Sequence, residues 1–194
     1  MDHARDYFNR YAEILGTIDT SRINVIIDVL FMSWKHGNHV FIVGNGGSAS
    51  SASHMACDLG KNTIYNPHDP SSRRFKVTSL TDNVSTMTAL GNDLGYEYIY
   101  SQQLSNLGRP GDVLIILTGS GNSPNVLKVI EKANILGMVT IGILGFDGGK
   151  AKDLVDHCII WPESNYGRVE DFHIMLNHVI RDGLMRMIED ERKY

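Results

Sequence analysis

Two absences set the first limits on this 194-residue chain: it has little cysteine and no excess of basic residues. Its cysteines are Cys57 and Cys158, so the chain does not look like a secreted scaffold held together by disulfides. Lysine and arginine together number 18 against 22 acidic residues, which gives a net charge of −4. This balance offers no broad positive field for nucleic acid or a membrane surface, so any bound anion must be held by local geometry.

Long apolar runs are lacking as well. The longest apolar stretch, residues 23–34, is interrupted by Asn24, Asp28 and Ser33 and is too short to cross a bilayer. The first six residues include two aspartates and an arginine and contain no apolar core of the kind that a signal peptide requires. We therefore expect a cytoplasmic protein with no membrane partner and no nucleic-acid partner.

What the sequence does contain is an alternation of short apolar segments with segments of helical periodicity. Apolar segments predict strands at 39–43, 76–80, 113–117, 139–144 and 157–161. Helical patterns surround them at 4–16, 20–36, 48–60, 83–91, 96–107, 123–136, 149–155 and 168–190. Strands that alternate with helices form a parallel sheet covered on both faces, so we predict an α/β three-layer sandwich. The sequence shows no linker or repeat, and residues 1–194 are expected to form a single domain with an N-terminal helical segment at 1–37.

Two loops rich in small residues follow predicted strands. The first loop reads Gly44-Asn45-Gly46-Gly47-Ser48, and the second reads Thr118-Gly119-Ser120-Gly121-Asn122-Ser123. Ligands of open parallel sheets bind beyond the carboxyl ends of the strands, where both loops fall. A strand, a small-residue loop and a helix start together aim backbone N–H groups and partial positive charge at one point. The two loops predict a site for a phosphorylated small molecule.

The second loop carries the stronger signal. Ser123 followed by Pro124 is a favourable helix start, in which Ser123 can cap the helix and Pro124 fits its first turn. Thr118, Ser120 and Ser123 then place three hydroxyls around one small cup. A lone loop of this kind is more often an ordinary turn before a capped helix, but three hydroxyls after a buried strand favour phosphate binding.

The first loop partly resembles the glycine-rich fingerprint of dinucleotide-binding proteins. Ala49 stands where that fingerprint has its third glycine, and Asp82 lies just beyond the next strand, where a ribose-binding acid would stand. The match is weak, and no Gly-Lys-Ser/Thr follows as a Walker loop would require. A tight turn that needs glycine backbone angles is the plainer interpretation.

Polar residues on two predicted helices form a second candidate site. His54 and Asp58 are four residues apart and share one face of the helix behind the first loop. On the last helix, Glu170 and His178 lie within one broad face, whereas His173 points away from His178. With one of these two histidines, the cluster would supply two nitrogen and two oxygen ligands for zinc, or a base and an acid for proton transfer. A polar helix surface is the alternative for the first pair, and we expect a packing role for His173.

Together these motifs resemble the sugar-isomerase (SIS) domain proteins, and among them the phosphoheptose isomerases. The resemblance rests on both loops, on His54 with an acid four residues later, on Asn92-Asp93, and on residues 168–173 with His178. It extends essentially from end to end. It implies a flavodoxin-like five-stranded parallel sheet and a homotetramer with active sites between subunits. It also implies conversion of D-sedoheptulose 7-phosphate into D-glycero-D-manno-heptose 7-phosphate through an enediol.

The resemblance implies roles for individual residues. It assigns catalysis to Asp58 and His178. One zinc ion per subunit would be held by His54, Asp58, Glu170 and His178. Substrate contacts are implied for residues of both loops and for two acids: Asn45, Gly46, Gly47, Ser48, Thr118, Gly119, Ser120, Ser123, Asp93 and Glu170.

Three positions depart from the family pattern. Asp58 replaces a glutamate that is one methylene longer, Glu170 replaces a glutamine and adds negative charge, and Asn62 stands where an arginine is common. The first two changes keep metal-binding atoms but alter reach and charge, whereas the third changes one substrate contact.

A non-catalytic SIS protein that binds a sugar phosphate or a replication initiator is the alternative from another class. The resemblance to such an initiator-binding relative is weaker because that relative lacks the acid and the histidine that Asp58 and His178 supply here. A regulator that senses sugar phosphates would need a DNA-binding domain, for which the chain has no room. An oxidoreductase that binds a dinucleotide is the weakest interpretation.

Overall fold

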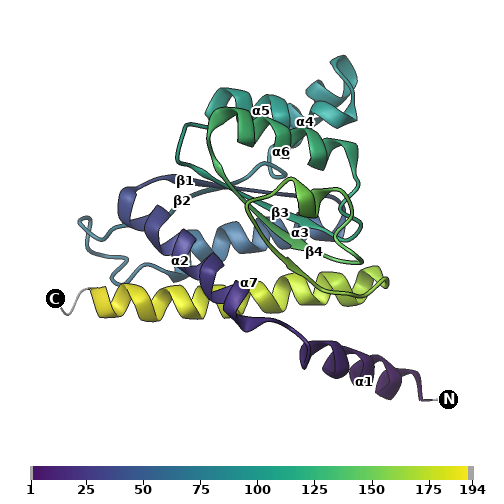
Figure 1. The fold of residues 1–194 in the computed structure, drawn as a ribbon. Coiled ribbons are helices and arrows are strands. Elements are labelled where there is room, and N and C mark those ends of the chain that lie inside the picture. The colour runs from purple at the N-terminus through teal and green to yellow at the C-terminus, as the bar shows by residue number, and fades with distance from the viewer. Residues whose placement is uncertain (1, 192–194) are drawn as a thin grey trace.

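The computed structural model describes residues 2–191 and contains one five-stranded parallel sheet between two layers of helices (Figure 1). The strands are β1 His39–Gly44, β2 Lys76–Ser79, β3 Val113–Thr118, β4 Val139–Leu144 and β5 His157–Ile160. Each strand ends within one residue of its predicted bounds. The strand order is β2-β1-β3-β4-β5, which is the flavodoxin-like order and confirms the predicted fold class.

The sheet order determines where the two small-residue loops meet. The chain turns to opposite sides of the sheet after β1 and after β3, which are adjacent and parallel. Crevices that bind ligands in such sheets form at this switch point, outside the carboxyl ends of the strands. The two loops leave β1 and β3 there, on either side of the switch point.

Helices account for most of the remaining chain. The α-helices are α1 His3–Leu15, α2 Thr20–His36, α3 Gly47–Cys57, α4 Val84–Asp93, α5 Ser101–Leu107, α6 Pro124–Leu136 and α7 Tyr166–Glu191. Three short helical segments are η1 Asp58–Asn62, which is π-helical, and the 3₁₀ turns η2 Tyr96–Tyr98 and η3 Ala151–Asp153.

Three predicted helices differ from those observed. The helix expected at 48–60 changes to a π-turn at Asp58. The helix expected at 96–107 begins as a 3₁₀ turn and becomes α-helical only at Ser101, with the buried Ile99 and Tyr100 between the two segments. The helix expected at 149–155 shrinks to η3, because two glycines with positive φ precede it.

Alternate residues of the strands fill two separate cores. In β1, Val40 and Ile42 pack with α2, α3 and α7, whereas Phe41 and Val43 pack with α5 and α6. A strand buried on both faces has this pattern because successive side chains point to opposite sides. The first core contains the interface between α3 and α7, where the candidate metal ligands lie.

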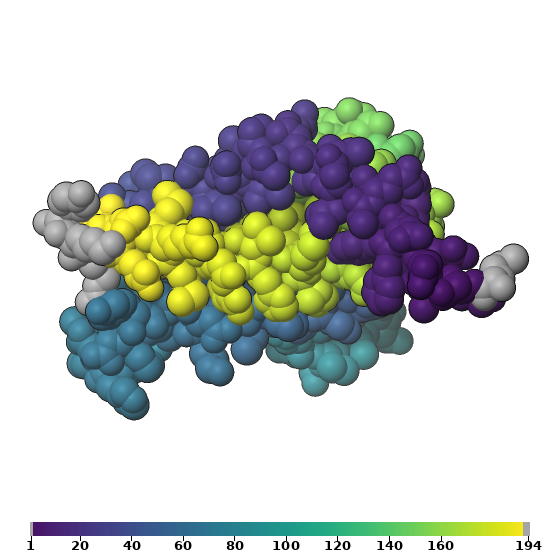
Figure 2. All heavy atoms as spheres, turned by 90° about the horizontal axis from the view of Figure 1, so that it is seen from below, coloured from purple at the N-terminus to yellow at the C-terminus, as the bar shows by residue number. Residues whose placement is uncertain are grey.

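The long helix α7 crosses the surface of the molecule, with the N-terminal helices along one side and the segment after α3 along the other (Figure 2). Helix α1 projects at one end and contacts the beginning of α7 (Figure 1). There the Tyr7 hydroxyl donates to Asp171, and the Tyr11 ring lies 4.7 Å from the Trp161 ring. Within residues 2–191, no helix has the length and apolar character needed to cross a membrane.

Candidate functional site

Packing of α3 against α7 brings together three of the predicted site residues. His54 comes from α3, Asp58 opens the π-turn η1, and His178 comes from α7. Asp58 Oδ2 lies 3.3 Å from His54 Nε2 and 3.5 Å from His178 Nε2. The two imidazole nitrogens are 3.4 Å apart. The three ligand atoms therefore form a nearly equilateral triangle.

The size of this triangle fits a zinc ion. Tetrahedral zinc with bonds of about 2.0–2.1 Å to nitrogen and oxygen has ligand atoms about 3.3–3.4 Å apart. The three measured separations, 3.3, 3.4 and 3.5 Å, agree with that value. Two imidazoles and one carboxylate are also a common donor set of catalytic zinc sites, which keep a further position for water or substrate. The residues present can hold a metal ion.

Asp58 is the buried centre of the cluster. Its side chain is 8% exposed, whereas the side chains of His54 and His178 are 43% and 42% exposed. Asn62 donates to Asp58 Oδ1 at 2.8 Å, and Asn177 donates to Asp58 Oδ2 at 2.7 Å. The carboxylate is thus held from within the protein, and the two imidazoles open the site to the surface.

Glu170, the predicted fourth ligand, does not lie in this cluster. Its carboxyl group rests against Gly47 so closely that a Cβ at that position would overlap it. Glu170 is eight residues before His178 on α7, a separation of about 12 Å along the helix axis. The carboxyl group lies instead at the N-terminus of α3, where the helix dipole favours a negative charge.

The second loop presents the three predicted hydroxyls at the end of β3. Thr118 Oγ1 accepts a hydrogen bond from the Gly121 N–H at 3.3 Å, and Ser120 Oγ accepts one from the Asn122 N–H at 3.3 Å. Pro124 occupies the first turn of α6 as predicted, but the side chain of Ser123 makes no capping hydrogen bond. Ser123 therefore occupies the N-cap position as predicted, but the predicted capping hydrogen bond is absent.

The two loops are joined by a pair of amides. Asn45 Nδ2 donates to Asn125 Oδ1 at 2.9 Å, and Asn125 Nδ2 donates to Asn45 Oδ1 at 2.8 Å. The hydroxyl of the buried Tyr100 also donates to the Gly44 carbonyl. This arrangement fixes the first loop relative to the start of α6. Asn45 is predicted to contact the substrate, but in this chain its side-chain amide makes these two hydrogen bonds with Asn125.

Glycines of the two loops admit close neighbours. Gly46 has a φ of 58°, a left-handed conformation that favours glycine. A Cβ at Gly119 would lie 2.7 Å from the Tyr166 ring at the start of α7. Side chains at these positions would strain the turn or displace the helix, so the small residues serve the shape of the site.

His173 is a buried packing residue, as predicted. It is 1% exposed, and burial lowers its pKa to about 4, so the ring is neutral at physiological pH. Its Nδ1 lies 3.4 Å from the hydroxyl oxygen of Ser48, at the first turn of α3. This contact links Ser48, the last residue of the first loop, to α7.

Asp93 lies apart from the other predicted residues. It ends α4, a helix with no buried residue, and accepts a hydrogen bond from the neighbouring Asn92 amide. Within residues 2–191, no hydrogen bond or ion pair joins Asp93 to either loop or to the metal cluster.

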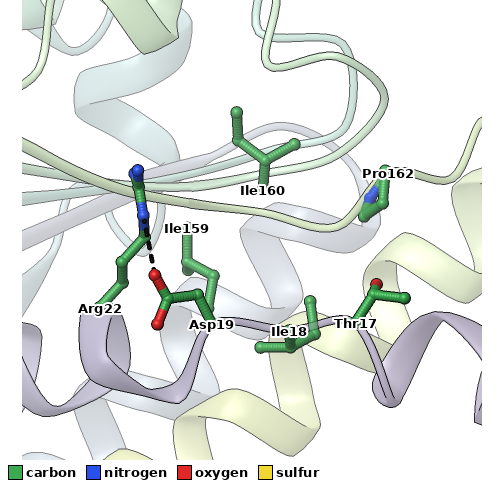
Figure 3. Close-up of a pocket in the computed structure, with 7 residues that line it drawn as sticks. All are labelled: Thr17, Ile18, Asp19, Arg22, Ile159, Ile160 and Pro162. Atoms are coloured by element: carbon green, nitrogen blue, oxygen red, sulfur yellow. Dashed lines mark ion pairs between the residues drawn. The ribbon is translucent and has the colours of Figure 1, made fainter.

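A hollow of about 230 Å³ elsewhere on the molecule lacks such chemistry. Figure 3 shows its lining, which comes from the α1–α2 connection and from the edge strand β5. Its charged groups are Asp19 and Arg22, which form an ion pair at 3.6 Å (Figure 3). The hollow brings no imidazole or free carboxylate to a common point, and the functional site is better placed between α3 and α7.

Sequence reasoning missed the two amides that support Asp58. Asn62 is four residues after Asp58, a spacing that indicates contact on a helix, but the family resemblance relates this position only to the substrate. Asn177 gave no signal beyond its place next to His178, because its role depends on the packing of two distant helices.

Comparisons with known proteins agree with this geometry. Residues 6–145 match the SIS domain family. The chain is 36% identical over 180 residues to a phosphoheptose isomerase of Nitratiruptor sp., covering 93% of this chain and 91% of that one. It is 42% identical over 152 residues to a phosphoheptose isomerase of Rhodospirillum rubrum, covering 78% of each.

Solved structures show the same relationship. The structure of phosphoheptose isomerase GmhA from Neisseria gonorrhoeae aligns with a TM-score of 0.85 at 27% identity, covering 94% of this chain and 97% of that one. A phosphoheptose isomerase from Francisella tularensis aligns with a TM-score of 0.84 at 26% identity, covering 95% and 97%. The chain therefore belongs to the SIS-domain family and, within it, to the phosphoheptose isomerases.

Proposed function

We propose that this protein is a ketose–aldose isomerase that converts D-sedoheptulose 7-phosphate into D-glycero-D-manno-heptose 7-phosphate. The observation that carries the proposal is the contact between a buried carboxylate and a half-exposed imidazole, Asp58 Oδ2 and His178 Nε2, at 3.5 Å. A proton acceptor and a proton donor at one point are what isomerisation requires. The family relationship supplies the substrate class.

The reaction moves one hydrogen between neighbouring carbons of the sugar. One group removes a proton from C1 of the ketose while the oxygen on C2 gains one, which gives the enediol. A proton then adds to C2, and the hydroxyl on C1 loses its proton to become the aldehyde oxygen. We assign these proton transfers to Asp58 and His178, whose Oδ2 and Nε2 atoms lie 3.5 Å apart.

We further propose that zinc occupies the triangle of His54, Asp58 and His178. The fit of the three ligand atoms to tetrahedral geometry supports this assignment. A bound zinc ion would polarise the sugar's carbonyl and hydroxyl oxygens. His54 would serve as a metal ligand, whereas Asp58 and His178 would combine metal binding with proton transfer.

The phosphate group is best placed at the second loop. Both loops precede a helix N-terminus, but the Glu170 carboxyl group lies against Gly47 at the start of α3 and would repel an anion there. The N-terminus of α6 has no acidic residue in its first turn and carries the unbonded hydroxyl of Ser123. We assign phosphate binding to Thr118, Gly119, Ser120 and Ser123, and sugar contacts to Asn45, Gly46, Gly47, Ser48, Asp93 and Glu170.

We also propose a homotetramer with active sites between subunits, and a cytoplasmic location for an enzyme of soluble sugar phosphates. Asp58 lies about 16 Å along the helix axis from Gly47, so the metal cluster is well removed from the first loop. Assembly would bring loops of a second chain towards the cluster. It would also let a Glu170 carboxyl group approach the cluster from a neighbouring subunit.

Proton NMR of the protein with sedoheptulose 7-phosphate in heavy water tests the proposed function. We expect a new aldose anomeric signal, with deuterium incorporated at the exchanging carbon, and a loss of turnover after chelation that zinc restores. No conversion under any of these conditions would reject the isomerase and favour the alternative of a non-catalytic sugar-phosphate-binding protein.

Replacement of Asp58 by Asn tests the assigned chemistry. The amide keeps the shape of the side chain but cannot accept the proton, so turnover should fall by at least about 100-fold, the lower range for loss of a general base. Circular dichroism should show an unchanged fold. The exposed Asp153→Asn serves as control and should keep full activity. Retained activity in Asp58→Asn would remove Asp58 from catalysis.

A further inference from the structure

Asn177 carries an unmet hydrogen-bonding group in the interior of the protein. The residue is 1% exposed, and its Oδ1 is buried without a hydrogen-bond partner. A buried polar atom left unpaired is unfavourable, and an apolar side chain of similar size would avoid that cost. The other end of the same amide donates to Asp58 Oδ2 at 2.7 Å. The hydrogen bond to Asp58 is therefore the reason for an amide, and not an apolar side chain, at this position.

Asn62 holds the same carboxylate from the opposite oxygen. Its Nδ2 donates to Asp58 Oδ1 at 2.8 Å across the π-turn η1, which begins at Asp58 and ends at Asn62. π-helical turns are rare and occur frequently at functional sites. This one places His54, Asp58 and Asn62 in a row with a spacing of four residues.

The two amides together fix how Asp58 faces the imidazoles. Each carboxylate oxygen accepts one N–H, so the carboxyl group cannot rotate without breaking both hydrogen bonds. An oxygen of a carboxylate has about two lone-pair sites, and Asn177 uses one of those on Oδ2. The other lone-pair site on Oδ2 is left for a metal ion, and Oδ2 is the oxygen that lies 3.3 Å from His54 Nε2 and 3.5 Å from His178 Nε2.

We propose that Asn62 and Asn177 are positioning residues that fix Asp58 as a metal ligand through Oδ2 alone, so that the affinity for a divalent ion depends on both amides. The inference rests on the metal site of the proposed function. Hydrogen-bond partners of ligating groups typically contribute a factor of about 10–100 to metal affinity. A role limited to packing would leave that affinity unchanged.

Zinc competition against a chromophoric chelator tests the inference on Asn177→Leu and Asn62→Ala. We expect each variant to bind zinc about 10–100-fold more weakly than the wild type, and to show a smaller zinc-induced rise in melting temperature. Asn134→Ala is the matched control, because Asn134 also donates one hydrogen bond, to the Leu154 carbonyl, away from the site. Its zinc affinity should equal that of the wild type.

Folded variants that bind zinc within about twofold of the wild type would overturn the inference, since only the larger loss of affinity is expected of ligand-supporting groups. If Asn177→Leu does not fold by circular dichroism, the half-buried Asn62→Ala decides the question. Wild-type protein that binds no zinc also overturns it, while turnover by that metal-free protein would leave the isomerase intact. Conversely, zinc binding with the expected losses but no isomerisation would reject only the proposed function.

Discussion

At the scale of single residues, replacing Ser123 distinguishes a contribution to substrate binding from a contribution to protein stability. It stands at the N-cap of α6, yet its hydroxyl makes no capping bond, and the Val126 N–H donates to Asn125 Oδ1 instead. Ser123→Ala should therefore change the free energy of unfolding by less than about 0.5 kcal/mol. If the hydroxyl binds phosphate, its loss should cost about 1.5–3 kcal/mol and raise KM about 10–100-fold with little change in kcat. Urea unfolding and steady-state kinetics measure the two effects.

Asn83→Ala is the control with the opposite expectation. Asn83 Oδ1 accepts a hydrogen bond from the Thr86 N–H at 3.0 Å and caps α4. Its loss should lower the free energy of unfolding by about 1 kcal/mol and leave KM unchanged. A Ser123→Ala variant that loses as much stability as Asn83→Ala while keeping its KM would show that Ser123 supports the helix and does not bind substrate.

The sequence predicts some site residues and misses others for a physical reason. His54 and Asp58 share a helix face, so their spacing alone places them together. The approach of His178 depends on how α7 packs on α3, which spacing within α7 cannot specify. For the same reason, the sequence does not predict the hydrogen bond from Asn177 to Asp58 or the contact of Glu170 with Gly47.

At the scale of elements, Glu163 ties two helices to the end of the sheet. It follows β5, and its Oε2 accepts hydrogen bonds from Arg168 of α7 at 2.9 Å and from Arg10 of α1 at 3.3 Å. Burial by itself would raise the pKa of Glu163, but the hydrogen bonds from Arg168 and from the Asn165 N–H outweigh it and lower the pKa to about 2. The charged form is therefore favoured by folding.

A lowered pKa in the folded state gives stability that is present above the unfolded pKa of about 4.3 and lost as pH falls towards 2. Glu163→Gln should lower the free energy of unfolding at pH 7 by up to about 3 kcal/mol and remove most of this loss between pH 5 and 2. Urea unfolding across that range measures it. Glu13→Gln removes an exposed partner of Arg10 and should change stability by less than about 1 kcal/mol. Equal pH profiles for Glu163→Gln and wild type would contradict the assignment.

Strands were easier to predict than short helices. In a chain whose strands alternate with helices, a short continuous apolar run such as residues 113–117 is readily assigned to a buried strand. The corresponding strand β3 is indeed buried along its whole length. The segment at 149–155 has helical periodicity, but Gly148 and Gly149 adopt positive φ and leave only one 3₁₀ turn. Local periodicity therefore failed where backbone conformation, which periodicity does not encode, determined the element.

At the scale of the whole molecule, the described chain leaves apolar stripes on its N-terminal helices. Phe8 and Leu15 of α1 are exposed and seven residues apart, and so are Val25 and Met32 of α2. Residues seven apart lie on one face of a helix, so each helix presents an apolar stripe to its surroundings. Exposed apolar surface marks interaction sites, subunit contacts among them, which supports a role for the N-terminal helices in the proposed homotetramer.

Size-exclusion chromatography with light scattering tests the assembly. The wild type should have about four times the mass of the 21.6 kDa chain. A buried charge at a subunit contact is costly, so Phe8→Asp and Met32→Asp should shift the protein to smaller species. If active sites lie between subunits, turnover should fall in parallel. Ile135→Asp is the control, because Ile135 is 78% exposed, as Phe8 is at 70%, but stands alone on α6. A wild type that is fully active as a monomer would reject both the tetramer and the shared site, and would require one chain to complete the cluster without Glu170.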